Sequence, residues 1–126
     1  MIFGNAILYT DFQCTGGIKM AVKHKCKITV IKRSFFPEIA YTQYGEGITP
    51  CDFYYDGQEF MVDEESYSRM LDGKFCGEAW DCVKRYVRTA LLGGTMIGGD
   101  SYVACCNDGS RPVMFKLERI DEEVDD

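Results

Sequence analysis

The strongest pattern of apolar and polar positions in the chain is helical and lies between residues 76 and 92. At about 100° per residue, the apolar side chains of this segment share one broad face and the charged side chains share the other. Gly93 and Gly94 follow, which is typical of a helix end. The segment therefore predicts one main amphipathic helix. Its expected inward face comprises Cys76, Ala79, Trp80, Val83, Tyr86, Val87, Ala90 and Leu91.

Short runs of alternating polarity predict strands before and after this helix. In the first run, Cys26, Ile28 and Val30 share one face. A turn signal over residues 107–110 separates the last two runs and predicts a C-terminal hairpin. The predicted strands cover residues 26–33, 58–62, 101–106 and 112–118. Their short connections predict an α+β fold in which a small, largely antiparallel sheet packs on the one main helix.

Weaker signals fill the region between the first strand and the helix. Residues 51–55 precede the Asp56-Gly57 turn, so they are a candidate hairpin partner for residues 58–62. Asp63 is a capping residue type and favours a short helix over residues 64–71. The glycine-rich segment 93–100 leads into a strand rather than a helix, so we expect a connector and not a phosphate-binding loop.

The two ends of the chain differ from its centre. The first residues show no clear period, whereas Met20 opens a lysine-rich segment that runs directly into the first strand. We expect Met20 to be the natural start, and a short strand at residues 6–10 is the alternative. The predicted organisation is an N-terminal extension over residues 1–19, a single α+β domain over residues 20–120 and an acidic, disordered tail over residues 121–126.

Charge changes the picture mainly by excluding partners. The net charge is −6, and five of the negative charges lie in the acidic end, so the body carries about −1. A near-neutral body without a basic stripe argues against nucleic-acid binding. The chain contains no run of about 18 apolar residues, so we expect no membrane partner.

Cysteine is the residue type that stands out in the composition. The chain has seven cysteines, an odd number, and no secretory signal pattern precedes them. A secreted disulfide framework is therefore disfavoured, and we expect reduced thiols in the cytoplasm.

Four of these cysteines are candidate metal ligands. Cys76 lies at the start of the main helix, where the helix dipole stabilises a thiolate. Cys105 and Cys106 end a strand and point to opposite faces, and Cys51 follows Pro50 in a loop. If the helix packs on the hairpin, these thiols converge, and zinc or an iron–sulfur cluster is the cofactor they would hold. No C-x-x-C motif occurs, so the packing of these cysteines in the core is the open alternative.

Two other side chains are candidates for ligand binding, each with a structural alternative. Trp80 could stack on a ligand or fill the core. Arg111 could clamp a carboxylate or a phosphate, or it could pair locally with Asp108. His24 is the only histidine and lies between two lysines, so it is expected to be a solvated side chain and not a catalytic base.

Taken in chain order, several short motifs resemble a known family. They are Pro50-Cys51, Asp56-Gly57-Gln58-Glu59-Phe60, Phe75-Cys76, Ala79-Trp80, Gly93-Gly94, Ala104-Cys105-Cys106-Asn107-Asp108-Gly109 and Arg111-Pro112-Val113. The family is an uncharacterised group of short, cysteine-containing proteins of bacteria and archaea, sometimes labelled uncharacterised repeat proteins, and many come from anaerobes. The resemblance covers about residues 24–120. Members of this family usually begin close to the first strand.

The resemblance implies no activity, because none is established for the family. It implies that Cys51, Cys76 and the Cys105/Cys106 pair belong to the family pattern, whereas Cys14 and Cys82 fall outside it. An anaerobic setting would favour oxygen-sensitive thiolate or iron–sulfur chemistry.

The sequence favours a small, non-catalytic accessory or binding domain whose cysteines pack the core or bind a metal, because it contains no evident set of acid, base and nucleophile. The alternative is a thiol-dependent redox or transfer enzyme that uses Cys76, with Cys51 or Cys106 as the resolving thiol. A redox protein is a candidate partner. A homo-oligomer that buries Phe35, Phe36 or Tyr54 at its interface is a further possibility.

Overall fold

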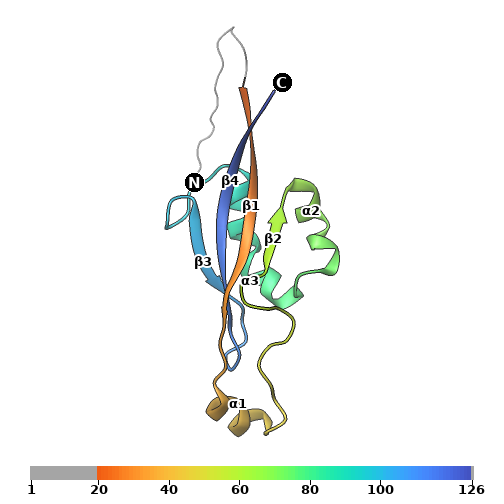
Figure 1. The fold of residues 1–126 in the computed structure, drawn as a ribbon, viewed down its shortest axis with the longest axis vertical. Helices are drawn as coiled ribbons and strands as arrows, with labels where there is room; N and C mark the ends of the chain where they lie inside the picture. Colours follow the sequence, from red (N-terminus) through yellow and green to blue (C-terminus); the bar gives the residue numbers. More distant parts are fainter. Residues whose placement is uncertain (1–19, 126) are drawn as a thin grey trace.

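The computed structural model describes residues 20–125 of the chain. The expected extension over residues 1–19, the short strand at residues 6–10 and Cys14 lie outside them. The described residues form an α+β fold whose sheet has four antiparallel strands in the order β2-β1-β4-β3 (Figure 1). The elements are β1 (Met20–Arg33), α1 (Pro37–Tyr44), β2 (Glu59–Val62), α2 (Glu64–Ser68), α3 (Gly77–Leu91), β3 (Ser101–Cys105) and β4 (Val113–Asp125).

Helix α3 lies behind the sheet and covers one of its faces (Figure 1). It contributes six buried residues, all from the predicted inward face: Ala79, Trp80, Val83, Val87, Ala90 and Leu91. These helix residues pack in one core with Ile28 and Val30 of β1 and with Phe115 and Leu117 of β4, which are all 0% exposed. The predicted α+β fold with one main helix is thus confirmed, and burial of this apolar surface supplies its main stabilisation.

The predicted C-terminal hairpin is also confirmed. Strands β3 and β4 pair antiparallel, and the register sets Ala104 opposite Phe115 on the helix side. The predicted hairpin between residues 51–55 and 58–62 is wrong, because residues 51–55 form no strand. Strand β2 instead pairs with β1, where the amide of Gly57 donates to the carbonyl of Val30 at 2.7 Å and brings the turn onto that edge.

The acidic end of the chain continues strand β4 and does not form the expected disordered tail, as far as Asp125. It pairs with the lysine-rich start of β1, so opposite charges face each other across the two strands. Nδ1 of His24 lies 2.7 Å from Asp121, and Nζ of Lys25 lies 3.2 Å from Glu122. This charge complementarity across the ladder favours pairing at the end of the sheet.

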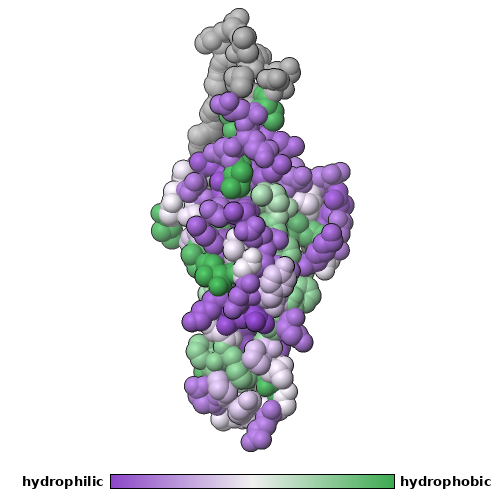
Figure 2. Space-filling model, viewed as in Figure 1, coloured by the Kyte–Doolittle hydropathy of each residue, from purple (hydrophilic) through white to green (hydrophobic). Residues whose placement is uncertain are grey.

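Helix α1 lies beyond the opposite end of the sheet (Figure 1). Only Ala40 of this helix is buried, whereas Ile39 is 46% and Tyr44 is 68% exposed. In the space-filling view, hydrophobic patches lie at this end and also interrupt the mostly hydrophilic body of the molecule (Figure 2). The placement of Tyr54 at an oligomer interface is wrong, since Tyr54 is 4% exposed in the core. None of the helices described here is long and apolar enough to cross a membrane.

The helix predicted over residues 64–71 ends at Ser68, and a left-handed turn follows it. Met70, Leu71 and Asp72 have φ angles of 50°, 56° and 54°, and Gly73 continues with 78°. This region costs a non-glycine residue about 1–2 kcal/mol because Cβ approaches the following carbonyl. The turn directs Leu71 into the core, where it is 7% exposed, and leads to Cys76.

We expect Met70→Gly to raise the free energy of unfolding by about 0.5–1 kcal/mol. Glycine relieves the left-handed strain, and its greater freedom in the unfolded chain offsets part of the gain. Met70 is 60% exposed, so its side chain contributes little packing. Urea unfolding measures the change, with Met70→Ala as the matched control. A glycine variant no more stable than the alanine variant would contradict the left-handed conformation.

Cys26 makes the stability of the fold depend on pH. Burial raises the pKa of this thiol to about 12, whereas an unfolded cysteine ionises near pH 8.5. The contribution of Cys26 to the free energy of unfolding is therefore complete below about pH 8.5. It is lost as the pH rises toward 12, by about 1.4 kcal/mol per pH unit. The difference in the free energy of unfolding between wild type and Cys26→Ala should therefore decrease by about 1.4 kcal/mol for each pH unit above about pH 9. Val62→Ala, opposite Cys26 in the sheet, is the control, and its effect should stay constant.

Candidate functional site

Three separate segments bring thiols to the α1 end of the sheet. Cys51 lies in the loop before β2, Cys76 is the N-cap residue of α3, and Cys106 directly follows β3. Backbone contacts hold two of them in place: Arg33 donates to the carbonyl of Cys51 at 3.0 Å, and the amide of Cys106 donates to Val113 at 3.0 Å. The site is therefore assembled by the pairing of distant segments.

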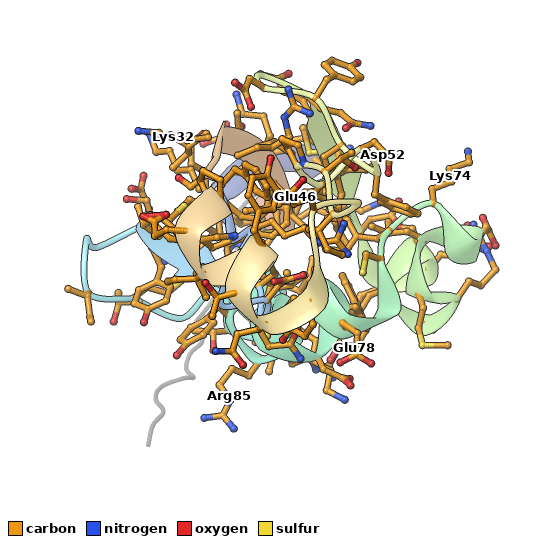
Figure 3. All side chains as sticks on the ribbon, turned by 90° about the horizontal axis from the view of Figure 1, so that it is seen from below. Lys32, Glu46, Asp52, Lys74, Glu78 and Arg85 are labelled. Carbon is orange, nitrogen blue, oxygen red and sulfur yellow. The ribbon has the colours of Figure 1, made fainter. Side chains whose placement is uncertain are left out.

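A side-chain bond also ties the loop after β3 to the helix. Asn107 donates to the carboxylate of Glu78, in the first turn of α3, at 2.8 Å. Asp52 and Glu78, labelled in the view from the α1 end, mark the loop of Cys51 and the start of α3 (Figure 3). The bond from Asn107 to Glu78 places the end of β3 next to the start of α3.

Tyr54 lies at the centre of these thiols. Its ring packs against Phe75 and Phe115, with centroids 5.3 Å and 5.2 Å away, and its hydroxyl accepts the amide proton of Cys76 at 3.0 Å. Burial raises the pKa of Tyr54, the amide of Cys76 opposes this rise, and negative charge on Cys76, Cys51 and Cys106 would add to it. The phenol therefore stays neutral and accepts a hydrogen bond at physiological pH.

Cys82, Cys105 and Cys106 form a second thiol group beside the first. Partial desolvation is the largest cause that raises the pKa of Cys82 and of Cys105, and the neighbouring thiol of Cys106 is the next in both. Cys106 also accepts the amide proton of Val113 at 3.3 Å on its sulfur. Thiols with raised pKa values are protonated near neutral pH, which makes them weak nucleophiles.

Cys82 and Cys105 of the second thiol group border a cavity of about 330 Å³ between α3 and the β3–β4 hairpin. Its lining residues are Cys82, Tyr86, Tyr102, Val103, Ala104, Cys105 and Met114. The rings of Tyr86 and Tyr102 stack with centroids 4.1 Å apart and form one wall. Sequence reasoning missed this role of Cys82 and Met114, and the only signal was the position of Cys82 on the flank of the helix's apolar face.

The four predicted metal ligands are not preassembled as a site. Within residues 20–125, no three or more histidine, cysteine, aspartate or glutamate side chains are grouped so that they could hold a metal ion. Cys51, Cys76 and Cys106 are gathered around Tyr54, but Cys105 is exposed. The six cysteines in this part of the chain are all free thiols.

The two predicted ligand-binding residues have other partners in the structure. Trp80 is 5% exposed and packs against Tyr67 and Phe75, so it lies in the core. Nε of Arg111 lies 2.9 Å from Asp108. Burial opposes the ionisation of Asp108, but the bonds from Arg111 and from the amide of Ser110 outweigh it, and the pKa of Asp108 lies below its usual value. The guanidinium is thus engaged in the local pair.

His24 is far from the thiols. Its Nδ1 contacts Asp121, whereas Cys106 contacts Val113 at the start of the same strand. The two positions on β4 are separated by about 26 Å of extended strand, at about 3.3 Å per residue. The only histidine of the chain therefore cannot act as the base for these thiols.

We expect Tyr54→Phe to lower the free energy of unfolding by about 1–2 kcal/mol, because the amide of Cys76 loses its acceptor at the start of α3. Tyr55→Phe is the matched control. Tyr55 is 62% exposed, and its variant should stay within about 0.5 kcal/mol of wild type. Urea unfolding compares the two, and equal effects would show that the Tyr54 hydroxyl has no structural role.

Comparison with known protein families, curated proteins and solved structures gives no match. The resemblance to the cysteine-containing bacterial and archaeal family stays a prediction from the motifs.

Proposed function

We propose that this chain is a small, non-catalytic binding domain whose thiols at the α1 end of the sheet hold a thiophilic ligand. The observation that carries the proposal is the arrangement of Cys51, Cys76 and Cys106 around the neutral hydroxyl of Tyr54. A reducing cytoplasm, in which these thiols stay free, is the compartment that suits it.

The partial exposure of these thiols supports binding over simple core packing. Cys26 shows what a core cysteine looks like here: it is 0% exposed, and its raised pKa keeps it protonated. Cys51, Cys76, Cys82 and Cys106 are only half-buried, and Cys105 is exposed. Sulfur atoms that line the surface at one end of a sheet are available to a ligand, whereas Cys26 is not.

The acid–base groups near the thiols do not favour catalysis. A nucleophilic thiol needs a base or a lowered pKa, but His24 is bound to Asp121 and the pKa values of Cys82 and Cys105 are raised. The rival hypothesis is a thiol-dependent redox or transfer enzyme. Its support is the position of Cys76 as the N-cap residue of α3, at the positive end of the helix dipole.

Alkylation of each cysteine separates the two hypotheses. The full chain is isolated without oxygen and treated with iodoacetamide at about pH 7, and mass spectrometry gives a rate for each thiol. A binding domain should show no thiol faster than free glutathione, and Cys26 should react only after unfolding. A rate for Cys76 about tenfold above glutathione would overturn the non-catalytic proposal.

The ligand is tested on the same preparation. One half is alkylated directly, and the other half is first unfolded with a chelator and refolded. If the native domain holds a thiophilic ligand, the thiols around Tyr54 should react more slowly in the direct sample, and elemental analysis identifies a bound metal. Identical rates in the two samples would contradict binding.

A further inference from the structure

Strand β3 lies at one edge of the sheet and pairs only with β4 (Figure 1). The amide of Cys106 and the carbonyl of Asp100 bond to the chain of β4, which shows which residues direct their backbone groups inward. These groups alternate in direction along an antiparallel strand, so the N–H and C=O groups of Val103 and Cys105 point away from β4. Within residues 20–125 they have no hydrogen-bond partner, and Val103 is 58% exposed. The edge is therefore open to another strand.

The residues of β3 carry none of the features that usually protect such an edge. The strand contains no charged residue and no proline, and its register with β4 has no bulge. The opposite edge differs, because β2 carries Glu59 and contacts α2. In β-augmentation, an extended peptide adds a strand to an exposed edge, and its main-chain hydrogen bonds supply affinity. β3 has the properties of such an edge, whereas β2 is partly protected.

Two open cavities lie along the edge of β3. The cavity of about 330 Å³ touches Tyr102 and Ala104 on the helix side of the strand, and also Val103 and Cys105 on the other face. Since side chains from both faces of one strand border it, this cavity runs along the edge. The second cavity has a volume of about 440 Å³ and is lined by Tyr86, Thr89, Thr95, Met96, Ile97 and Tyr102. The stacked rings of Tyr86 and Tyr102 belong to both linings and so lie between the two cavities.

This arrangement defines the side chains that a bound strand would present. Alternate residues of an added strand point to the helix side of the sheet, about 6.6 Å apart. One apolar side chain would enter the first cavity beside Cys82 and Ala104. The apolar side chain two residues along would enter the second cavity beside Thr89 and Met96. The residue between them would lie next to Val103 on the outer face of the sheet.

Arg85 of α3 places a cation beside both cavities. It lies three residues after Cys82 and four before Thr89, and residues at these spacings are neighbours on one side of a helix. Arg85 is exposed, and its labelled side chain projects from α3 into solvent (Figure 3). Among the described residues it has no ion-pair partner, unlike Lys84 and Arg88 of the same helix. The cation is thus available to a carboxylate of a bound peptide.

From the open edge, the two cavities and this cation, we propose that β3 is the docking edge for an extended peptide that adds a fifth strand to the sheet. The peptide carries two apolar residues separated by one residue, with an acidic residue beside them that pairs with Arg85. The inference goes beyond the proposed function, because the peptide site lies along β3 and is not the thiol group around Tyr54. Either one can therefore fail while the other stands.

The test selects a phage-displayed library of random peptides on the full chain. The enriched peptides should share the two spaced apolar residues and an aspartate or glutamate. Fluorescence polarisation of one enriched, fluorescein-labelled peptide then gives the dissociation constant. Val103→Pro should weaken binding at least about tenfold, because proline removes a donor from the edge and its ring blocks the added strand. The sheet tolerates proline there, since the amide of Val103 does not bond to β4.

Two matched variants control for the side chain and for the edge. Val103→Ala keeps the backbone donor and should stay within about threefold of wild type, as surface substitutions usually do. Met61→Pro makes the same backbone change at an outward-facing residue of β2, on the opposite edge, and should bind like wild type. Circular dichroism confirms that each variant is folded.

Charge reversal tests the role of Arg85. Arg85→Glu should weaken binding of the acidic peptide about fivefold, in the range of an exposed ion pair. A peptide with lysine in place of its acidic residue should bind Arg85→Glu more tightly than it binds wild type. Equal affinities of Arg85→Glu and wild type for both peptides would overturn the acidic part of the motif.

The docking edge itself has three contrary outcomes. Failure to enrich any peptide, or equal affinities for Val103→Pro and Val103→Ala, would overturn it. Binding that is lost in Met61→Pro and kept in Val103→Pro would move the site to β2. Light scattering tests the other occupant, since a dimer that Val103→Pro converts to a monomer would show that a second copy of the chain covers the edge.

Discussion

The long antiparallel pairing of β1 with β4 is the constraint on which the rest of the structure depends. It joins the start of the domain to its end over nearly the full length of both strands, from Met20–Asp125 to Arg33–Val113. β2 and β3 each add to an outer edge of this pair, and α3 packs across it. Because both strands are extended along the whole ladder, residues at its two ends are held far apart. The thiols near Val113 and the ion pairs near Asp121 therefore belong to different parts of the molecule.

Local periodicity was sufficient to predict the elements that bury one face along a continuous segment. The main helix and the last hairpin fall in this class, since their apolar spacing and the turn over residues 107–110 act within a few residues. The strand status of the acidic end was not predictable in this way. Five acidic residues read alone resemble a solvated tail, and only the opposing His24 and Lys25 of β1 make strand pairing favourable there.

The same distinction explains the two other errors. Residues 51–55 have a strand-like composition and a turn after them, but the edge of β1 is the better partner for the chain beyond that turn. The left-handed turn at Met70–Asp72 is opposed by local preference, because each of its three residues is strained there. Burial of Leu71 within the turn and of Phe75 just after it offsets that strain. Such a conformation follows from packing and has no local sequence signal.

The candidate site was predicted only as far as cysteine position allowed. The start of α3 and the end of β3 identified Cys76 and Cys106, and the structure places both beside Tyr54. Cys82 and Met114 were missed because a cavity lining depends on the register of two strands and on how a helix lies against them. Trp80, in contrast, was a predicted ligand-binding residue because its large aromatic ring could stack on a ligand, but in the structure it is buried in the core.

The environment of Cys82 and Cys105 affects nucleophilic catalysis and the binding of a soft metal ion in different ways. Burial and crowding keep Cys82 and Cys105 protonated, and that state lowers the reactivity of a nucleophile. Binding of a soft cation is affected differently. The cation replaces the thiol protons, and its positive charge offsets the repulsion between neighbouring thiolates. A nucleophile in this position would need a base, which His24 cannot supply, because it lies beside Asp121 at the far end of the β1–β4 ladder. The same surroundings that disfavour thiol catalysis are therefore compatible with a site for a thiophilic ion.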